Sequence, residues 1–88
     1  MNTFTLTIAT PDGNRFHGEA EGLFVRGTEG DLAVLAGHTP FFTAIRPGVC
    51  SVDTPDGERR TGHTDGGLLS VGTDRVTLLS DSFRWDES

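Results

Sequence analysis

The chain has no lysine, no tyrosine and only one cysteine, and each of these absences limits the functions that can be expected of it. All 7 basic residues are arginines, against 13 acidic residues, which gives a formal net charge of −6. A chain this acidic, with no basic stripe, is not expected to bind nucleic acid or anionic lipid through its own surface. We expect a partner surface to be neutral or basic where it makes contact.

Cysteine and long apolar runs are equally scarce. Because Cys50 is the only cysteine, the chain cannot form an internal disulfide, which fits a reducing cytoplasm. No stretch approaches the roughly 18 apolar residues that a membrane span requires. The first residues also lack the basic and apolar regions of a signal peptide. We therefore expect no direct membrane insertion, so that any membrane association is indirect.

Short runs of alternating apolar and polar residues, separated by turn residues, follow one another along the chain. Residues 4–8 alternate apolar side chains with threonine, 11–14 have the composition of a tight turn, and 16–20 return with the same alternation. Further apolar segments follow at residues 23–25, 32–35, 41–45, 49–52, 69–71 and 76–78. No segment has the spacing of an amphipathic helix, and turn signals recur about every 8–12 residues. The pattern predicts an all-β domain, a sandwich or a barrel.

Two segments interrupt this alternation. A change of phase at Gly22 predicts a β-bulge there, and it places Phe24 on the outer face, where a large aromatic residue is unexpected. Residues 58–64 are polar, and they fit either an edge strand or a loop.

The end of the chain differs in composition from the rest. From residue 82 onward the sequence is polar except for Phe83 and Trp85. We therefore expect the β-domain to occupy residues 1–81 and a short polar tail to occupy residues 82–88.

No arrangement of side chains predicts catalysis, and we expect no catalytic, metal-binding or cofactor-binding residues. His17, His38 and His63 lie too far apart in sequence to supply the close ligand pair of a zinc site. Cys50 has no positively charged neighbour to lower its pKa, so we predict a small core residue. Gly66-Gly67 lacks the following Lys-Ser/Thr and helix of a phosphate loop, which favours a tight turn or close backbone packing.

Three segments, in order, carry a sharper signal. Residues 28–48 contain Thr-Glu-Gly-Asp, Gly-His-Thr-Pro and Thr-Ala-Ile-Arg-Pro-Gly. Residues 66–81 contain Gly-Gly-Leu-Leu-Ser-Val and Arg-Val-Thr-Leu-Leu-Ser-Asp, and residues 10–18 contain Thr-Pro-Asp-Gly and Phe-His-Gly. Each piece alone is weak, but together, at matching spacing, they resemble the epsilon subunit of the F-type ATP synthase over nearly the whole chain.

The resemblance implies a ten-stranded β-sandwich, the N-terminal domain of epsilon, with no active site of its own. In that family the domain belongs to the central stalk, or rotor. It packs against the gamma subunit and touches the polar loops of the membrane c-ring, so that rotation of the ring reaches the catalytic head. The resemblance also implies a monomer in a peripheral complex at the cytoplasmic face of the bacterial cell membrane, without a cofactor or nucleic acid.

Matching the family's motifs to this sequence gives two sets of expected contact residues. The residues expected at the c-ring are Glu29, Gly30 and Asp31. The residues expected at gamma are Thr10, His38, Thr39, Pro40, Phe42 and Thr43. Aromatic residues are enriched at interfaces, so we also expect Phe24 and the Phe41-Phe42 pair to supply buried anchors at the gamma contact.

Typical bacterial members of the family continue into a pair of C-terminal helices that can inhibit hydrolysis and, in some members, bind ATP. This sequence stops at Ser88, without a helical hairpin. If that is the natural end, we expect a subunit that couples but lacks this type of inhibition.

The alternative function is a free-standing β-sandwich module that binds a small ligand or a peptide. Such a module usually has a pocket lined by aromatic residues. An aromatic content of 8%, with no tyrosine, disfavours it.

Overall fold

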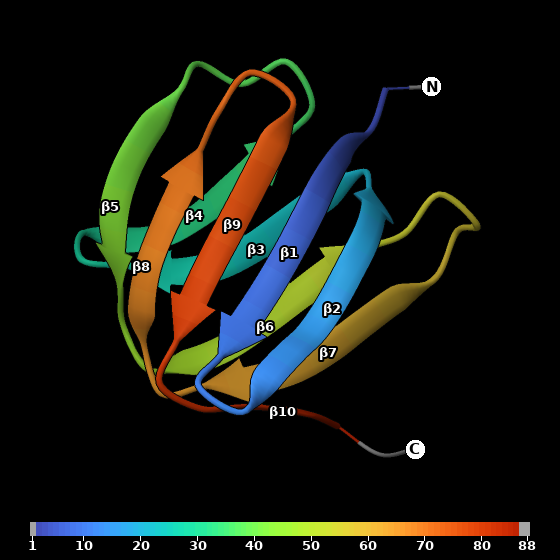
Figure 1. Cartoon of the computed structure of the whole chain (residues 1–88). Coiled ribbons are helices and arrows are strands. Elements are labelled where there is room, and N and C mark those ends of the chain that lie inside the picture. Colours follow the sequence, from blue (N-terminus) through green and yellow to red (C-terminus); the bar gives the residue numbers. More distant parts are fainter. Residues whose placement is uncertain (1, 87–88) are drawn as a thin grey trace.

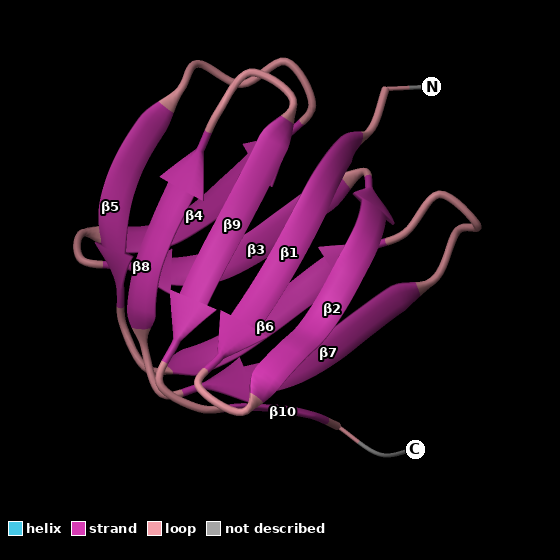
Figure 2. Ribbon diagram, in the orientation of Figure 1, coloured by secondary structure: helices cyan, strands magenta, loops and turns pink. Residues whose placement is uncertain are grey.

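The structure, a computed structural model, describes residues 2–86, and this part of the chain contains ten β-strands and no helix. Figure 2 shows the strands joined by loops and turns. The bounds are β1 (Phe4–Thr10), β2 (Gly13–Ala20), β3 (Gly22–Gly27), β4 (Gly30–Leu35), β5 (Phe41–Ile45), β6 (Gly48–Asp53), β7 (Arg59–Thr64), β8 (Gly67–Val71), β9 (Arg75–Ser80) and β10 (Phe83–Trp85). The expectation of an all-β fold with ten strands is confirmed.

The strands lie in two facing layers, as in a sandwich (Figure 1). One layer has the order β5-β8-β9-β1-β2, and the other contains β4, β3, β6, β7 and β10. The layers are joined along one side, where β3 pairs with β5 at Gly27↔Ile45. Neighbouring strands are antiparallel except for β1 and β9, which are parallel and bring the first and ninth strands side by side.

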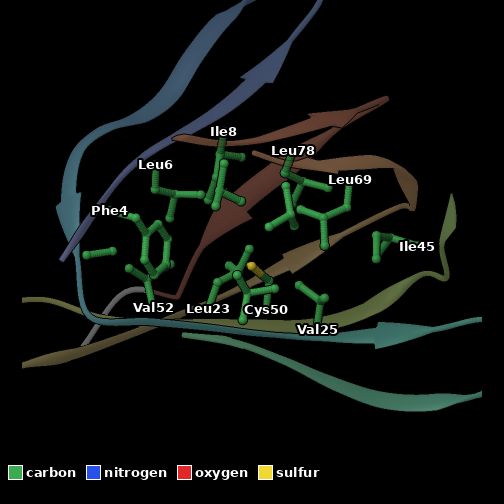
Figure 3. Close-up of a cluster of buried hydrophobic side chains, with 14 of the residues drawn as sticks. Phe4, Leu6, Ile8, Leu23, Val25, Ile45, Cys50, Val52, Leu69 and Leu78 are labelled. Atoms are coloured by element: carbon green, nitrogen blue, oxygen red, sulfur yellow. The ribbon is translucent and has the colours of Figure 1, made fainter. Parts of the chain in front are cut away.

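The apolar interior comes directly from the period of two along each strand. Inward-facing side chains of β1, β8 and β9 meet those of β3 and β6 across the gap between the layers (Figure 3). Burying a side chain of this size contributes about 1.5–3 kcal/mol. The largest fully buried side chains are Leu6, Ile8, Leu23, Leu69, Leu78, Val34, Val52 and Cys50.

The phase change at Gly22 is present, but its predicted cause, a β-bulge, is wrong. β2 ends at Ala20 and β3 begins at Gly22, so Glu21 is the corner at which the chain passes from one layer to the other. The register shift of the first hairpin lies instead between Ile8 and Ala9. A corner and a bulge look alike in sequence, because both displace the alternation by one residue.

The segment that the sequence left undecided forms a strand. Residues Arg59–Thr64 make β7, which pairs with β6 along its whole length and with β10 at Gly62, His63 and Thr64. Gly62 permits this second pairing, because a Cβ there would lie 2.5 Å from the carbonyl oxygen of Arg84.

The sheet extends into the segment expected to be a tail. Phe83 is buried in the core, and Trp85 packs against the core from the next inward position of β10. The indole Nε1 of Trp85 donates a hydrogen bond of 2.9 Å to the carbonyl oxygen of Arg15 on β2, across the open side of the sandwich. Alternation did not reveal β10, because a strand of 3 residues is too short to show a period. Residues 87–88 of the expected tail lie outside the described residues.

The Gly66-Gly67 pair serves close packing and a turn, as predicted. Gly66 has φ +98, a conformation that favours glycine, and a Cβ there would lie 2.9 Å from the carbonyl oxygen of Ile45. A Cβ at Gly67 would overlap the backbone carbonyl of Leu79 on the neighbouring strand. The β8–β9 pairing therefore requires a residue without a side chain at position 67.

We expect the Gly67→Ala substitution to lower the free energy of unfolding by about 3 kcal/mol or more, because the backbone of β9 must move to admit the methyl group. The measurement is the midpoint of urea-induced unfolding. Gly18→Ala is the matched control, since a Cβ at Gly18 makes only ordinary contacts at 3.9 Å with the ring of Phe16. Equal midpoints for the two variants would contradict the close approach at position 67.

Candidate functional site: two outer sheet faces

The described part of the chain has no candidate metal site. None of its His, Cys, Asp and Glu side chains form a group of three or more that could hold a metal ion. Cys50 is fully buried, and desolvation raises the pKa of its thiol to about 12, which keeps it neutral and unreactive. Residues 2–86 also contain no helix long and apolar enough to cross a membrane.

The outer face of the β5-β8-β9-β1-β2 layer carries apolar side chains that no other part of residues 2–86 covers. Phe42 is 67% exposed, Leu79 53% and Leu68 43%. The register places Ala44 beside Leu68, Leu68 beside Leu79, and Leu79 beside Ala9, so that these four residues form one row across the sheet. Phe42 lies next to this row, two residues before Ala44 on the same face of β5. Exposed apolar side chains gathered in this way mark interaction surfaces. We call Phe42, Ala44, Leu68, Leu79 and Ala9 the apolar patch.

Hydroxyl groups continue the same face beyond the apolar patch. Ser70 lies beside Phe42 on one side and beside Thr77 on the other, and Thr7 follows on β1. The hydroxyls of Thr3 and Thr5 donate hydrogen bonds of 2.6 and 2.9 Å to the carboxylate of Glu19. These bonds, from Thr3 first and then Thr5, hold the pKa of Glu19 below its usual value. An apolar centre with a polar rim is the usual anatomy of a protein–protein interface.

The structure places the residues expected at gamma along the borders of this face. Phe42 belongs to the apolar patch. His38, Thr39 and Pro40 form the loop before β5, and Thr39 and Pro40 are exposed. Thr43 is half-buried and turned inward by the alternation of β5.

Thr10 is not brought together with the other residues expected at gamma. The start of β5 pairs with the end of β8 at Phe41↔Val71, whereas Thr10 closes the opposite end of the same layer, where it pairs with Gly13 (Figure 1). The apolar patch lies between the two groups. A single partner could contact both groups only by covering the patch as well.

Two of the expected aromatic anchors do not belong to the apolar patch. Phe41 is half-buried against the core, and its ring centroid lies 5.5 Å from that of His38. Phe24 does face outward, but it is half-buried, and the guanidinium of Arg59 lies 4.7 Å from its ring centroid. Within the Phe41-Phe42 pair, only Phe42 is available as an anchor.

The residues expected at the c-ring lie at the turn between β3 and β4, where Glu29 is part of the turn and Gly30 and Asp31 begin β4. Glu29, Gly30 and Asp31 are all exposed, and the turn projects from one side of the sandwich (Figure 1). Gly30 has φ +129, a backbone conformation that favours glycine and permits the tight reversal of the chain. The carboxylate of Asp31 lies 3.6 Å from Nε of Arg26 across the hairpin. A pair as exposed as this contributes little to stability, so both groups remain free to meet another charge.

Sequence reasoning missed most of the apolar patch, although a signal was present. Leu68-Leu69 and Leu78-Leu79 are apolar doublets within strands, as is Phe41-Phe42. Because side chains alternate between the faces of a strand, one member of each doublet must point away from the core. The doublets therefore identify Leu68, Leu79 and Phe42 as outward-facing once the strands are known.

Comparison with known proteins agrees with this architecture. Residues 3–86 match the family described as the ATP synthase, delta/epsilon chain, beta-sandwich domain. A curated relative, the ATP synthase epsilon chain of Psychrobacter cryohalolentis, is 39% identical over 82 residues. The match covers 93% of this chain and 59% of that relative, so the chain spans less than two thirds of the relative's length.

Two solved structures have the same fold at low sequence identity. One is a chain of the Euglena gracilis mitochondrial ATP synthase, from its OSCP/F1/c-ring, with a TM-score of 0.90 and 23% identity over 97% of this chain and 54% of that one. The other is from the central stalk and c-ring of the Tetrahymena thermophila mitochondrial ATP synthase, with a TM-score of 0.78 and 11% identity over 92% of this chain and 65% of that one.

We expect Cys50 not to react with a disulfide-type thiol reagent while the chain is folded at pH 8, because the thiol is buried and its pKa is raised to about 12. Release of the reagent's thiolate, followed by absorbance, measures the reaction. Unfolding in urea should make Cys50 fully reactive. A Leu68→Cys variant is the positive control, since position 68 is exposed and should react at once in the folded chain. A native Cys50 that reacts as fast as this control would contradict its burial.

Proposed function

This chain belongs to the ATP synthase delta/epsilon chain family, and from that premise we propose that it is a non-catalytic central-stalk (rotor) subunit of an F-type ATP synthase. In this role it links the gamma subunit to the c-ring and helps to couple proton translocation to ATP synthesis. The observation that carries the proposal is the apolar patch, an exposed surface suited to docking on a domain whose described residues form no candidate metal site.

The gamma subunit is the proposed partner of the apolar patch. Phe42, Leu68 and Leu79 would supply the desolvated centre of that contact, and the surrounding hydroxyl groups its polar rim. Several residues assigned to gamma by the family's motifs support this arrangement, because Thr39 and Pro40 lie at one end of this face and Thr10 lies at the other. A partner that covers the patch would reach both borders.

The acidic turn at Glu29, Gly30 and Asp31 is the proposed contact with the c-ring. Its two carboxylates are exposed on a hairpin that projects beyond the sheets. Charge complementarity with basic or polar ring loops would fix the register of the contact more than its affinity. The turn is anchored by the regular β3–β4 pairing from Gly22↔Leu35 to Gly27↔Gly30, so force on it passes directly into the sheet.

Transmission of torque requires a rigid body between the two contacts. The close-packed interior shared by both layers resists deformation in a way that a surface built from loops does not. The proposed place of the subunit is peripheral, at the cytoplasmic face of the bacterial cell membrane, as a monomer within the complex and without a cofactor. The free-standing binding module remains the alternative if the chain does not bind gamma.

We expect Leu68→Glu to weaken binding to purified gamma by about tenfold or more, because it places a charge at the centre of the proposed interface. The measurement is the dissociation constant by biolayer interferometry, with melting curves to verify the fold. Val49→Glu is the matched control, since Val49 is similarly exposed but lies on the opposite layer. An equal or greater loss of affinity for Val49→Glu would show that gamma does not bind the apolar patch specifically. If the unaltered chain does not bind gamma, the alternative function as a binding module is favoured.

In a reconstituted enzyme, we expect Asp31→Lys to reduce proton-driven ATP synthesis by about threefold or more while binding to gamma persists, because it reverses a charge at the proposed ring contact. The rate of synthesis per assembled complex is the measurement. Asp74→Lys makes the same change in the exposed β8–β9 turn and should have little effect. Synthesis unchanged in the Asp31→Lys enzyme would remove the acidic turn from the coupling contact.

A further inference from the structure

The outer face of the other layer is hollowed by a groove that shares only Asp31 with the proposed rotor contacts. The groove has a volume of about 870 Å³ and runs along β4, β3 and β6 beside the loop that joins β5 to β6. Its lining includes Phe24, Arg26, Arg46, Pro47, Val49 and Arg59. We call it the arginine groove.

The groove arises where one strand changes neighbours. β3 pairs with β6 only from Gly22↔Asp53 to Phe24↔Ser51, and it then passes to β5 at Gly27↔Ile45. The N–H of Arg46 donates a hydrogen bond of 2.8 Å to the carbonyl oxygen of Arg26 and closes one end of the separation. The hollow is thus built into the way the two layers are joined.

The base of the groove is apolar. Val49 is 47% exposed, and the half-buried ring of Phe24 lies beneath the guanidinium of Arg59. The carboxylate of Asp53 holds that guanidinium from Nε and Nη2, at 2.6 and 3.0 Å. The hydrogen bonds from Arg59 to Asp53 lower the pKa of the Asp53 carboxyl and raise the pKa of the Arg59 guanidinium, so both groups stay charged. The ion pair therefore fixes one wall of the groove.

Positive charge is concentrated here in a chain that is otherwise strongly acidic. Three of the 7 arginines line the groove, and among residues 2–86 Asp31 is its one acidic lining residue. Arg26 is paired with Asp31 and Arg59 with Asp53, whereas Arg46 is exposed and has no ion-pair partner within residues 2–86. A free guanidinium beside an apolar base is a site that can recognise a carboxylate and an apolar side chain together.

We propose that the arginine groove binds a short acidic segment of a partner protein, which places an apolar side chain on Phe24 and Val49 and a carboxylate against Arg46. A planar guanidinium suits a carboxylate, and an apolar base suits the anchor residue of a peptide. A long polyanion such as nucleic acid is repelled by the chain as a whole, whose net charge is −6. A short acidic segment interacts mainly with the nearby arginines, because more distant charges are screened by salt. The site lies on the layer opposite the apolar patch, so it does not depend on the proposed contact with gamma.

The test is a titration of the isotopically labelled 88-residue chain with two capped peptides, followed by amide chemical shifts. The probes are acetyl-Glu-Leu-Glu-Leu-Glu-amide and its counterpart with lysine in place of glutamate. The glutamate peptide should shift the amide resonances of Phe24, Arg46 and Val49, and the lysine peptide should not. Equal binding of both peptides, shifts confined to the apolar patch, or tighter binding of a duplex oligonucleotide would each overturn the proposal.

Charge-reversal variants separate this site from the rotor contacts. Arg46→Glu should weaken binding of the glutamate peptide by about tenfold, the order expected when a hydrogen bond to a charged group is lost. Arg75→Glu makes the same change on the opposite layer and should leave the affinity unchanged. Melting curves establish that both variants fold. Binding to gamma should persist in Arg46→Glu, so that failure at either surface is recognised independently, and an unchanged peptide affinity in Arg46→Glu would contradict the assignment.

Discussion

The close facing of two β-layers across a single apolar interior is the constraint on which the rest of the structure depends. In a chain of 88 residues, the inward side chains of nearly every strand are needed to fill that interior. Cys50 is part of this filling, and its burial raises the pKa of its thiol to about 12. With the interior fully used, the outer faces and the turns are what remain for partners.

Much of the fold could be predicted from the sequence, because alternation is a direct record of which face of a strand is buried. The strands from Phe4 to Ser80 could be predicted in this way, except for residues 59–64. This segment could not be assigned to a strand or a loop, because its side chains are polar on both faces. The corner at Glu21 was mistaken for a bulge, because both shift the alternation by one residue. β10 was missed because it is too short to show a period, and its role depends on a tertiary contact: Trp85 reaches the backbone of β2, 70 residues away in the sequence.

The candidate site was less predictable than the fold. Motif resemblance identified the acidic turn and the loop before β5, but the apolar patch is made by register, which places Leu68, Leu79 and Ala9 in one row. The arginine groove depends even more on the fold, since Arg26, Arg46 and Arg59 are distant in sequence and meet only where β3 leaves β6. The two layers consequently have outer faces of different chemistry, one apolar with hydroxyl groups around it and one rich in arginine. A body with two unlike faces and a projecting acidic turn is suited to contact several neighbours at once.

The proposed contact with gamma lies on the apolar patch. A photoreactive cross-linker attached through a Leu68→Cys variant in the assembled enzyme tests it most directly, because the native thiol of Cys50 is buried and does not compete for the label. We expect a cross-link to gamma from position 68 and none from the equivalent Val49→Cys variant on the opposite face. A cross-link to gamma from position 49, with none from position 68, would contradict it.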